Sequence, residues 1–361
     1  MKYKDGNIVK KIGILTFHYA DNYGAVLQAY ALRRVINVLP DCVAEIINFV
    51  PKEFTYSLYK NDIKSRQLLC GKRKKFEDFL QKTCGISSPM ISKVEGNQYD
   101  YYCVGSDQVW NIMLGDVEFF LPHLDENAIR ISYAASIGMS SEKVYEYKDL
   151  FEKHVSKFKE ISLREQAHVD FIQTVCHKEC QCVLDPTLLL KTEDYSAIIT
   201  EDHVKNKPFI LFFWLFHDDN LMKGIEFVNT LSRKYGLPIV HTVADAKSYM
   251  FNMDYGNVFY EGVDYFLWYI KNASFVVTNS YHATLFSMQF KTPFYTFLVD
   301  KMSSRMNTLS KKFGICDRMV NSYINPGKLD DNIDFGYIEE RLIVERDKSI
   351  DFLKAALDVK I

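Results

Sequence analysis

Lys11-Ile12-Gly13-Ile14-Leu15-Thr16-Phe17 is a short apolar run, and it opens the pattern that decides the fold. After a polar turn, the segment from Gly24 to Val38 places apolar residues at helical spacing. A second apolar run then extends from Cys42 to Phe49. Strand, helix and strand in this order predict a βαβ unit, which is the building block of a parallel sheet.

The same alternation continues along the chain. Residues 52–98 are an exception, because they are charged and Lys-rich, and we expect only short helices there. Elsewhere the apolar patterns predict strands at 101–104, 130–135, 160–163, 181–184, 209–216, 238–243 and 274–278, and helices at 147–157, 221–235 and 263–270.

The length of 361 residues exceeds what one hydrophobic core usually serves, which favours two domains. Asp185-Pro186-Thr187 and the polar residues after it predict a boundary. We therefore expect an α/β protein with two Rossmann-like domains, residues 1–187 and 188–337, that face a central cleft. An amphipathic helix over 338–357 is expected to pack back on the first domain.

The charge balance limits the partners. The chain has 44 Lys+Arg and 46 Asp+Glu, for a formal charge of −2, so no global field attracts nucleic acid and any anion site must be local. The N-terminal residues lack the apolar core of a signal peptide, and the first apolar run is too short to span a bilayer. We expect a cytoplasmic protein.

The eight cysteines are scattered, which favours reduced thiols over a disulfide framework. Cys176, Cys180 and Cys182, with His177 among them, are the one group that resembles metal ligands. A second C-x2-C pair is missing from the sequence, so we interpret this group as a buried strand edge and predict no metal site.

Two polar loops follow predicted strands of the first half. Asn22, Tyr23 and Gly24 lie at the start of the first helix, where free backbone N–H groups can hold a polar ligand. An ordinary capped turn is an equally good interpretation.

The second loop reads Val104-Gly105-Ser106-Asp107-Gln108-Val109-Trp110-Asn111. Gly105 permits close approach, Gln108 and Asn111 offer donors and acceptors, and Asp107 has the chemistry of a general base. A Ser-Asp pair after a strand is also a common cap, so spacing alone leaves both interpretations open.

Two further positions carry positive charge or a titratable ring. Arg164 ends the apolar run Ile161–Leu163, where it would hold an anion at a sheet edge or pair with the neighbouring Glu165. His282 lies in a strand-turn-helix segment, within the first helical turn, where backbone N–H groups favour an anion. A histidine there is a tunable acid, although a structural role is equally open.

Neither G-x-G-x-x-G nor G-x-x-x-x-G-K-[ST] occurs, so no fingerprint indicates a dinucleotide or a nucleoside triphosphate. Six motifs in order instead resemble the polysaccharide pyruvyl transferase family, over a span from Ile12 to about Leu309. They are the F-H-x-x-x-N-Y-G-A-x-L-Q-A-Y-A-L stretch (Phe17 to Leu32), V-G-S-D-Q-V-W-N (104–111), Tyr133 to Gly138, S-L-R-E (162–165), Asp185-Pro186-Thr187 and S-Y-H-A-T-L-F-S (280–287).

This resemblance implies a fold similar to the GT-B glycosyltransferases, with phosphoenolpyruvate bound between the domains. It also implies transfer of the pyruvyl group to two hydroxyls of a sugar, forming a ketal and releasing phosphate, in the synthesis of surface polysaccharides or capsule. Arg164 and His282 match the family's arginine and histidine. Some relatives carry an arginine where this chain has Ser280, so we expect Arg305 to complete the phosphoenolpyruvate site beside Ser280.

The chemistry suits these residue types. Protonation of the vinyl carbon needs an acid such as His282, and the phosphate needs cations. His282 is thus either the general acid or a phosphate ligand. Asp107 would deprotonate the sugar hydroxyl or orient the sugar with Gln108 and Asn111, and the loop at Asn22, Tyr23 and Gly24 would face the acceptor. We predict no cofactor beyond the donor substrate.

Two other functions stay open on sequence grounds. One is a glycosyltransferase of the same architecture that uses a nucleotide sugar, and the other is a non-catalytic sugar- or anion-binding protein. The acceptor could be lipid-linked, and the basic run Lys72, Arg73, Lys74 and Lys75 would then touch the anionic inner membrane leaflet, unless it is simply a solvated helix face.

Overall fold

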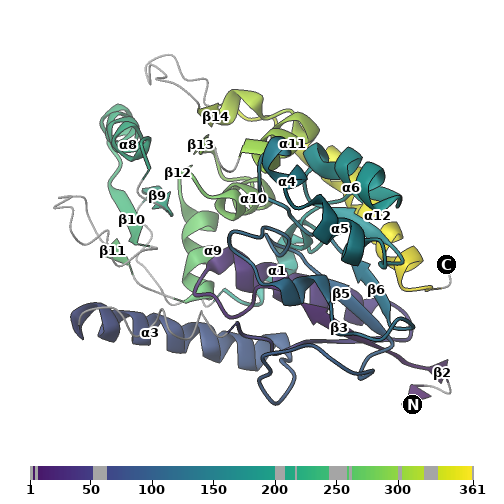
Figure 1. Ribbon diagram of the computed structural model, residues 1–361. Coiled ribbons are helices and arrows are strands. Elements are labelled where there is room, and N and C mark those ends of the chain that lie inside the picture. Colours follow the sequence, from purple (N-terminus) through teal and green to yellow (C-terminus); the bar gives the residue numbers. More distant parts are fainter. Residues whose placement is uncertain are drawn as a thin grey trace.

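The structure is a computed structural model, shown in Figure 1. The residues it describes are 3–4, 7–51, 63–199, 208–215, 218–243, 258–259, 262–299, 303–320 and 332–359.

The first half is built on a parallel sheet with the strand order β4-β3-β5-β6. As the sequence predicts, helix α1 crosses from β3 to β4, and its inner face is buried because its apolar residues recur at helical spacing. Single bridges from Ile131 to Glu160 and from Ala135 to Leu163 extend β6 toward the parallel pair β7-β8. The bounds are β3 (Lys10–Leu15), α1 (Tyr23–Val38), β4 (Cys42–Ile46), β5 (Tyr101–Val104), β6 (Ile129–Ser132), β7 (Ile161–Leu163) and β8 (Cys180–Cys182).

Short helices lie between the outer strands of this half or follow its last strand, β8. They are α4 (Ser141–Tyr145), α5 (Lys148–Val155), η3 (Gln166–His168), α6 (Val169–Cys176), η4 (Pro186–Leu188) and α7 (Thr192–Ser196). Cys176 and Cys180 are buried and Cys182 is half-buried. Within the described residues, no group of three or more His, Cys, Asp or Glu side chains is arranged to hold a metal ion.

The second half contains a six-stranded parallel sheet with the order β11-β10-β9-β12-β13-β14. This is the 3-2-1-4-5-6 order of the Rossmann fold, in which the strand order reverses between the first and fourth strands. The bounds are β9 (Ile210–Trp214), α8 (Leu221–Tyr235), β10 (Ile239–Val243), β11 (Val258–Phe259), α9 (Val263–Asn272), β12 (Phe275–Thr278), α10 (Tyr281–Gln289), β13 (Phe294–Phe297), α11 (Ser303–Phe313) and β14 (Met319–Val320). The predicted α/β fold class is confirmed.

The two halves share a hydrophobic core. One continuous cluster of buried side chains includes Ile12 on β3 and Phe213 on β9. Tyr23, at the start of α1, stacks on Phe266 of α9 with ring centroids 4.6 Å apart and an interplanar angle of 6°. Figure 1 shows the purple helix α1 beside the green helix α9. The halves therefore pack together through side chains from both, while the predicted boundary at residue 187 stays a prediction.

The last helix, α12 (Phe335–Ala356), returns to the first half. The Ser349 hydroxyl accepts a hydrogen bond from the Leu184 N–H at 3.0 Å. The ring of Phe352 lies 6.3 Å from the ring of Tyr133, the residue after β6. The Lys10 ammonium donates to the Leu357 carbonyl at 2.7 Å. Residues from both ends of the chain thus meet beside the first sheet.

The region between β4 and β5 differs from the sequence prediction. In place of short helices, one helix of 17 residues, α3 (Ile63–Phe79), continues into a single π-helical turn, Leu80–Cys84. Residues 52–62 of this region lie outside the described part of the chain. Phe76 of this helix and Leu80 of the turn that follows it are buried against the shared core, a contact that composition alone does not reveal.

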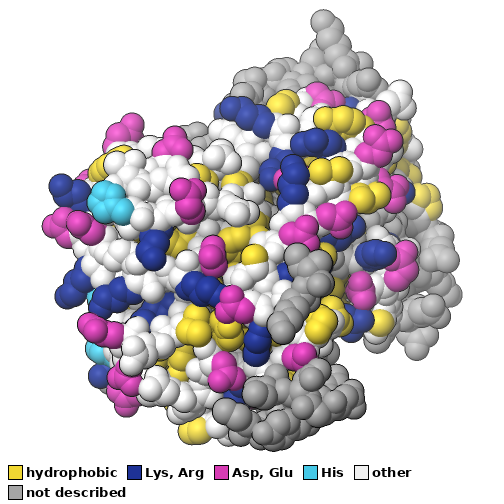
Figure 2. All heavy atoms as spheres, turned by 90° about the vertical axis from the view of Figure 1, so that its right-hand side faces the viewer, with side chains coloured by type: hydrophobic (Ala, Val, Ile, Leu, Met, Phe, Trp, Pro, Cys, Tyr) yellow, Lys and Arg dark blue, Asp and Glu magenta, His cyan; other side chains and the backbone are white. Residues whose placement is uncertain are grey.

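The basic run on α3 is only partly exposed. Lys72 is buried, with its ammonium over the rings of Tyr23 and Phe76, and Arg73 pairs with Asp21 and Glu77. Lys74 and Lys75 are exposed. On the face shown in Figure 2, Lys and Arg side chains alternate with Asp and Glu and form no large basic patch. Among the described helices, none is both long and apolar enough to cross a membrane.

Candidate functional site

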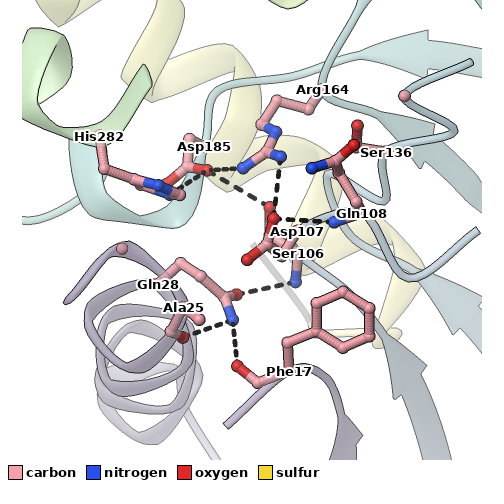
Figure 3. A network of polar contacts seen from close by, with 12 residues as sticks. Phe17, Ala25, Gln28, Ser106, Asp107, Gln108, Ser136, Arg164, Asp185 and His282 are labelled. Carbon is pink, nitrogen blue, oxygen red and sulfur yellow. Dashed lines mark hydrogen bonds and ion pairs between the residues drawn. The ribbon is translucent and has the colours of Figure 1, made fainter. Parts of the chain in front are cut away.

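Three loops that follow strands of the first half place charged side chains together. Arg164 follows β7, Asp107 lies in the loop after β5, and Asp185 lies in the loop after β8. Arg164 donates from Nη1 to Asp185 Oδ2 at 2.6 Å, and its Nη2 lies 3.3 Å from Asp107 Oδ1 (Figure 3). The carboxyl ends of parallel strands meet at one sheet edge, which explains why distant positions converge.

These charges are almost wholly removed from solvent. The side chains of Arg164 and Asp185 are 0% exposed, and that of Asp107 is 12% exposed. Burial alone would raise the pKa of the Asp185 carboxyl, but His282 and Arg164 outweigh burial and hold that pKa well below its ordinary value. Asp185 is therefore an anion under ordinary conditions.

The second half contributes His282, in the first turn of α10. Its Nε2 lies 3.4 Å from Asp185 Oδ2, an ion-pair contact across the two halves. On the other side of the ring, a Cβ atom at Gly24 would come within 1.9 Å of His282 Nδ1. The imidazole is therefore fixed between a carboxylate and the glycine at the start of α1, where only a residue without a side chain fits.

Arg305, on α11, is the second buried arginine of the site and is 3% exposed. Its Nε and Nη2 atoms have no hydrogen-bond partner among the described residues. These two nitrogens form one edge of the guanidinium group, the edge that binds a carboxylate or two phosphate oxygens side-on. Burial and the nearby Arg164 lower the pKa of Arg305. A buried cation with an open edge is typical of an anion-binding site.

Glu165 supplies the neighbouring negative charge. Its Oε1 accepts hydrogen bonds from the Ser136 hydroxyl at 3.1 Å and from the N–H groups of Ile137 and Gly138 at 2.7 and 3.2 Å. Burial would raise the pKa of Glu165, but His168, Arg164 and Arg305 lower it to about 2. Glu165 thus anchors the loop after β6 and balances part of the arginine charge.

A buried amide joins helix α1 to this cluster. Gln28 accepts from the Ser106 N–H at 3.0 Å (Figure 3). Its amide also donates to Thr16 Oγ1 at 2.9 Å. Ser106 in turn donates to the Ala134 carbonyl at 2.9 Å and lies 3.4 Å from Asp185 Oδ2. The loops after β3, β5 and β6 are therefore held in one network.

The structure brings together five of the residues that the sequence singles out. Asp107, Arg164 and His282 all contact one another directly or through Asp185, and Arg305 lies beside Arg164. Gly24 contacts His282. This arrangement agrees with a single site formed by both halves.

Other predicted residues have contacts that support the local fold. Asn22 caps α1, because its side chain accepts from the N–H groups of Gly24 and Ala25. Tyr23 is buried in the shared core. Ser280 caps α10 by accepting from the Ala283 N–H at 3.3 Å.

The two amides after Asp107 bond mainly within their own loop. Asn111 donates to the side-chain oxygen of Gln108 at 3.1 Å and to the Gly138 carbonyl at 3.3 Å, and it accepts from Met113. Gln108 is half-buried and Asn111 is buried. Their contacts with substrate, like those of Asn22, Tyr23 and Ser280, stay predictions.

Sequence reasoning missed Asp185, Glu165 and Tyr281 as site residues. Asp185 has a capping role as well, since it accepts from the N–H and hydroxyl of Thr187. A signal was present, because Asp185 follows an apolar run as Asp107 and Arg164 do, and such positions lie at the same sheet edge. The D-P-T motif instead drew attention as a boundary.

The arrangement has clear chemical capacity. Two arginines and a histidine face three carboxylates in a buried volume, and the open edge of Arg305 can accept an anion. The ion pair with Asp185 orients the His282 ring, as a general acid requires. The site is therefore suited to binding an anion and transferring a proton to it.

Comparison with known proteins gives the family and the fold. A profile of the family described as polysaccharide pyruvyl transferase matches residues 22–301. No curated protein sequence matches the chain significantly. This range contains Asp107, Arg164, Glu165, Asp185 and His282, whereas Arg305 lies beyond it.

Two solved structures illustrate the fold. A UDP-N-acetylglucosamine 2-epimerase from Rickettsia bellii is 10% identical, covers 98% of this chain and 100% of its own, and superposes with a TM-score of 0.51. MnaA from S. aureus, solved in a co-structure with UDP, is 12% identical, covers 96% of this chain and 91% of its own, and has a TM-score of 0.50. These likenesses show a GT-B-like fold. Because the family match covers most of the chain and five of the six charged or titratable residues at the site's centre, the chain belongs to the polysaccharide pyruvyl transferase family.

Proposed function

We propose that the protein transfers the pyruvyl group of phosphoenolpyruvate to two hydroxyls of one sugar, forming a cyclic ketal and releasing phosphate. The observation that carries this proposal is the buried guanidinium of Arg305, whose Nε and Nη2 have no hydrogen-bond partner within the described residues. Phosphoenolpyruvate has a phosphate and a carboxylate, and a small dianion or trianion is the ligand that this edge, Arg164 and His282 would recognise together.

Arg305 is the candidate for a cation that the sequence leaves unassigned in the donor site. Ser280 occupies the position at which some relatives have an arginine, and its hydroxyl caps α10. Arg305 reaches the same site from α11 and lies 5.7 Å from the ring of Tyr281, the residue after Ser280. We propose that Arg305 supplies the missing cation of the donor site.

The reaction balances as follows. An acid adds a proton to the methylene carbon C3 of phosphoenolpyruvate, and the positive charge at C2 accepts the oxygen of the first sugar hydroxyl, which loses its proton. The C2–O bond to phosphate then breaks, and the second hydroxyl attacks C2 and loses its proton. One hydroxyl proton replaces the proton used at C3, and the other leaves with phosphate. Buried cations favour departure of the phosphate.

We assign the acid role to His282. The Asp185 carboxylate lies beside Nε2 of this ring and favours its protonated form, as an acid requires. We assign the base role to Asp107, since its side chain is 12% exposed whereas that of Asp185 is fully buried. Asp107 is therefore the carboxylate that an incoming sugar hydroxyl can reach.

The test is to incubate the protein with phosphoenolpyruvate and a panel of free and lipid-linked sugars, and to measure both phosphate and the mass of the product. We expect phosphate release that depends on acceptor, with a pyruvylated sugar as product. Turnover of UDP-sugars without any reaction of phosphoenolpyruvate would indicate a glycosyltransferase instead. Ligand binding with no turnover, unchanged in His282→Ala, would indicate a binding protein.

A further inference from the structure

Tyr281 contacts the two arginines and the histidine of the donor site. It is the first residue of α10 and is 5% exposed. The guanidinium carbon of Arg164 lies 4.7 Å from the centre of its ring, and that of Arg305 lies 5.7 Å away. The His282 ring meets it edge-on, with centroids 5.4 Å apart at an angle of 84°.

Two buried guanidinium groups in one site repel each other, and their freedom to move differs. Arg164 is held by Asp107 and Asp185, whereas Arg305 has an open edge. Glu165 attracts Arg305, and its Oε2 atom has no hydrogen-bond partner in the described part of the chain. Without another restraint, Arg305 would be expected to turn toward Glu165 and close its open edge.

An aromatic ring can bind a guanidinium group without using the N–H groups of that guanidinium. The face of the ring is negative, so it attracts a guanidinium within about 6 Å and leaves the guanidinium hydrogens available for an anion. Burial raises the pKa of Tyr281 above its ordinary value, so the ring carries no charge of its own that would compete with the substrate.

We infer that Tyr281 is a positioning residue of the donor site: the face of its ring holds Arg305 beside Arg164, with the Nε–Nη2 edge of Arg305 open to the anionic substrate. This inference rests on the proposed function for the identity of the anion. It concerns the ring and not the hydroxyl, because Tyr281 meets Arg164, Arg305 and His282 through its ring.

The sharpest test varies the charge of the ring face and leaves its shape nearly constant. Tyr281→Phe is the reference, and phenylalanines with increasing numbers of fluorine atoms replace it in turn. We expect Tyr281→Phe to behave like the wild type, and the KM for phosphoenolpyruvate to rise with each fluorine, reaching roughly tenfold, while kcat changes less. A flat series, or a loss already complete in Tyr281→Phe, would overturn the inference.

A matched pair of variants separates positioning from packing. Tyr281→Leu and Phe286→Leu each remove a buried ring from α10, but Phe286 contacts Tyr195, Phe266 and Phe290 and neither arginine. We expect both to lower the melting temperature and only Tyr281→Leu to weaken anion binding. Equal binding by the two variants would contradict the inference.

Calorimetric titration with inorganic phosphate keeps the two proposals distinguishable. If the wild type releases no phosphate from phosphoenolpyruvate, the proposed function fails, and the phosphate affinities of the fluorinated series still report on Tyr281. If the wild type turns over and the series is flat in both KM and phosphate affinity, the proposed function stands and the role of Tyr281 is wrong.

Discussion

At the scale of single residues, the two buried arginines differ in how they are paired. Arg164 has carboxylate partners at both terminal nitrogens, whereas Arg305 has an open edge. A buried cation with unsatisfied donors lowers the stability of the folded protein, and a bound anion recovers that free energy. Replacement of Arg305 should therefore affect substrate binding and stability in different directions.

Arg305→Met keeps the length of the side chain and removes the charge. We expect the KM for phosphoenolpyruvate to rise about 10- to 100-fold, because charge-assisted hydrogen bonds are worth about 1.5–3 kcal/mol each. The free energy of unfolding should stay equal or increase, since an unpaired charge leaves the interior. Steady-state kinetics and denaturant unfolding measure the two effects.

The matched control is Arg318→Met. Arg318 is equally buried, but it donates to the Tyr295 hydroxyl at 3.1 Å and to the Asn332 carbonyl at 2.9 Å. Arg318→Met should lower the free energy of unfolding and leave the KM for phosphoenolpyruvate within about twofold of the wild-type value. If Arg305→Met instead lost stability as Arg318→Met does, with an unchanged KM, Arg305 would be structural.

Glu165 gives the site an acid-sensitive contribution to stability. Its folded pKa of about 2 lies below the ordinary value of 4.5, so this contribution is full above pH 4.5 and declines as the pH falls toward 2. Glu165→Gln removes the ionisation. When the pH falls from 5 to 3, we expect the free energy of unfolding of the wild type to fall by about 2 kcal/mol more than that of the variant. Urea unfolding at pH 5 and pH 3 measures the difference. Equal losses of unfolding free energy in the wild type and the variant would contradict the prediction.

The sequence predicted some of these residues and not others. Arg164, Asp107 and His282 could be found because each follows a predicted strand and has a distinctive chemical group. Asp185 also follows an apolar run, but it was interpreted as part of a domain boundary, and its contact with His282 joins segments far apart in the sequence. The open edge of Arg305 is likewise a property of packing, although its charge could be noticed in the sequence.

At the scale of elements, the site depends on the N-termini of α1 and α10. They meet where Gly24 contacts the ring of His282. Both helices are capped by their own polar residues, Asn22 and Ser280, so each helix start is held by contacts within its own segment. The position of His282 therefore depends on the absence of a side chain at Gly24.

Gly24→Ala tests this contact. The added methyl group would lie 1.9 Å from His282 Nδ1, so the ring must move, and a displacement of this size should lower kcat by about 100-fold. The control is Gly71→Ala on α3, where an added Cβ meets nothing within 4 Å. That variant should gain about 0.5–1 kcal/mol of stability with unchanged kcat. Equal kcat values for both variants would contradict the account.

Most strands and helices of the two halves could be predicted because their apolar residues recur with a clear period. The βαβ unit at β3, α1 and β4 is the clearest case, and α8 has the predicted bounds. Helix α3 was not predicted as one long helix, because its sequence is rich in charged residues and the burial of Phe76 against the shared core is not visible in a local pattern.

At the scale of the whole molecule, the shared core makes the two halves one packing unit. The stacked rings of Tyr23 and Phe266 belong to different halves, and the cluster around them includes residues of both sheets. The α/β alternation of each half could be anticipated from the sequence, but the extent of this contact could not, since it depends on side chains far apart in sequence. The proposed site lies beside this contact.

We therefore expect both halves to unfold in one cooperative transition. Tyr23→Ala should lower the free energy of unfolding by about 3–5 kcal/mol and keep the transition single. Hydrogen exchange followed by mass spectrometry checks whether peptides of both sheets lose protection together. Loss of protection in one sheet while the other stays folded would show that the shared core does not couple them.

The central claim is that phosphoenolpyruvate is the donor. Its most direct test follows the phosphorus resonance of phosphoenolpyruvate by NMR while the protein and a pool of sugar acceptors are present. We predict that the signal converts to inorganic phosphate only when both protein and acceptor are present, and that conversion falls at least about 100-fold in His282→Ala. An unchanged phosphoenolpyruvate signal across the whole acceptor pool, or equal conversion by His282→Ala, would contradict the account.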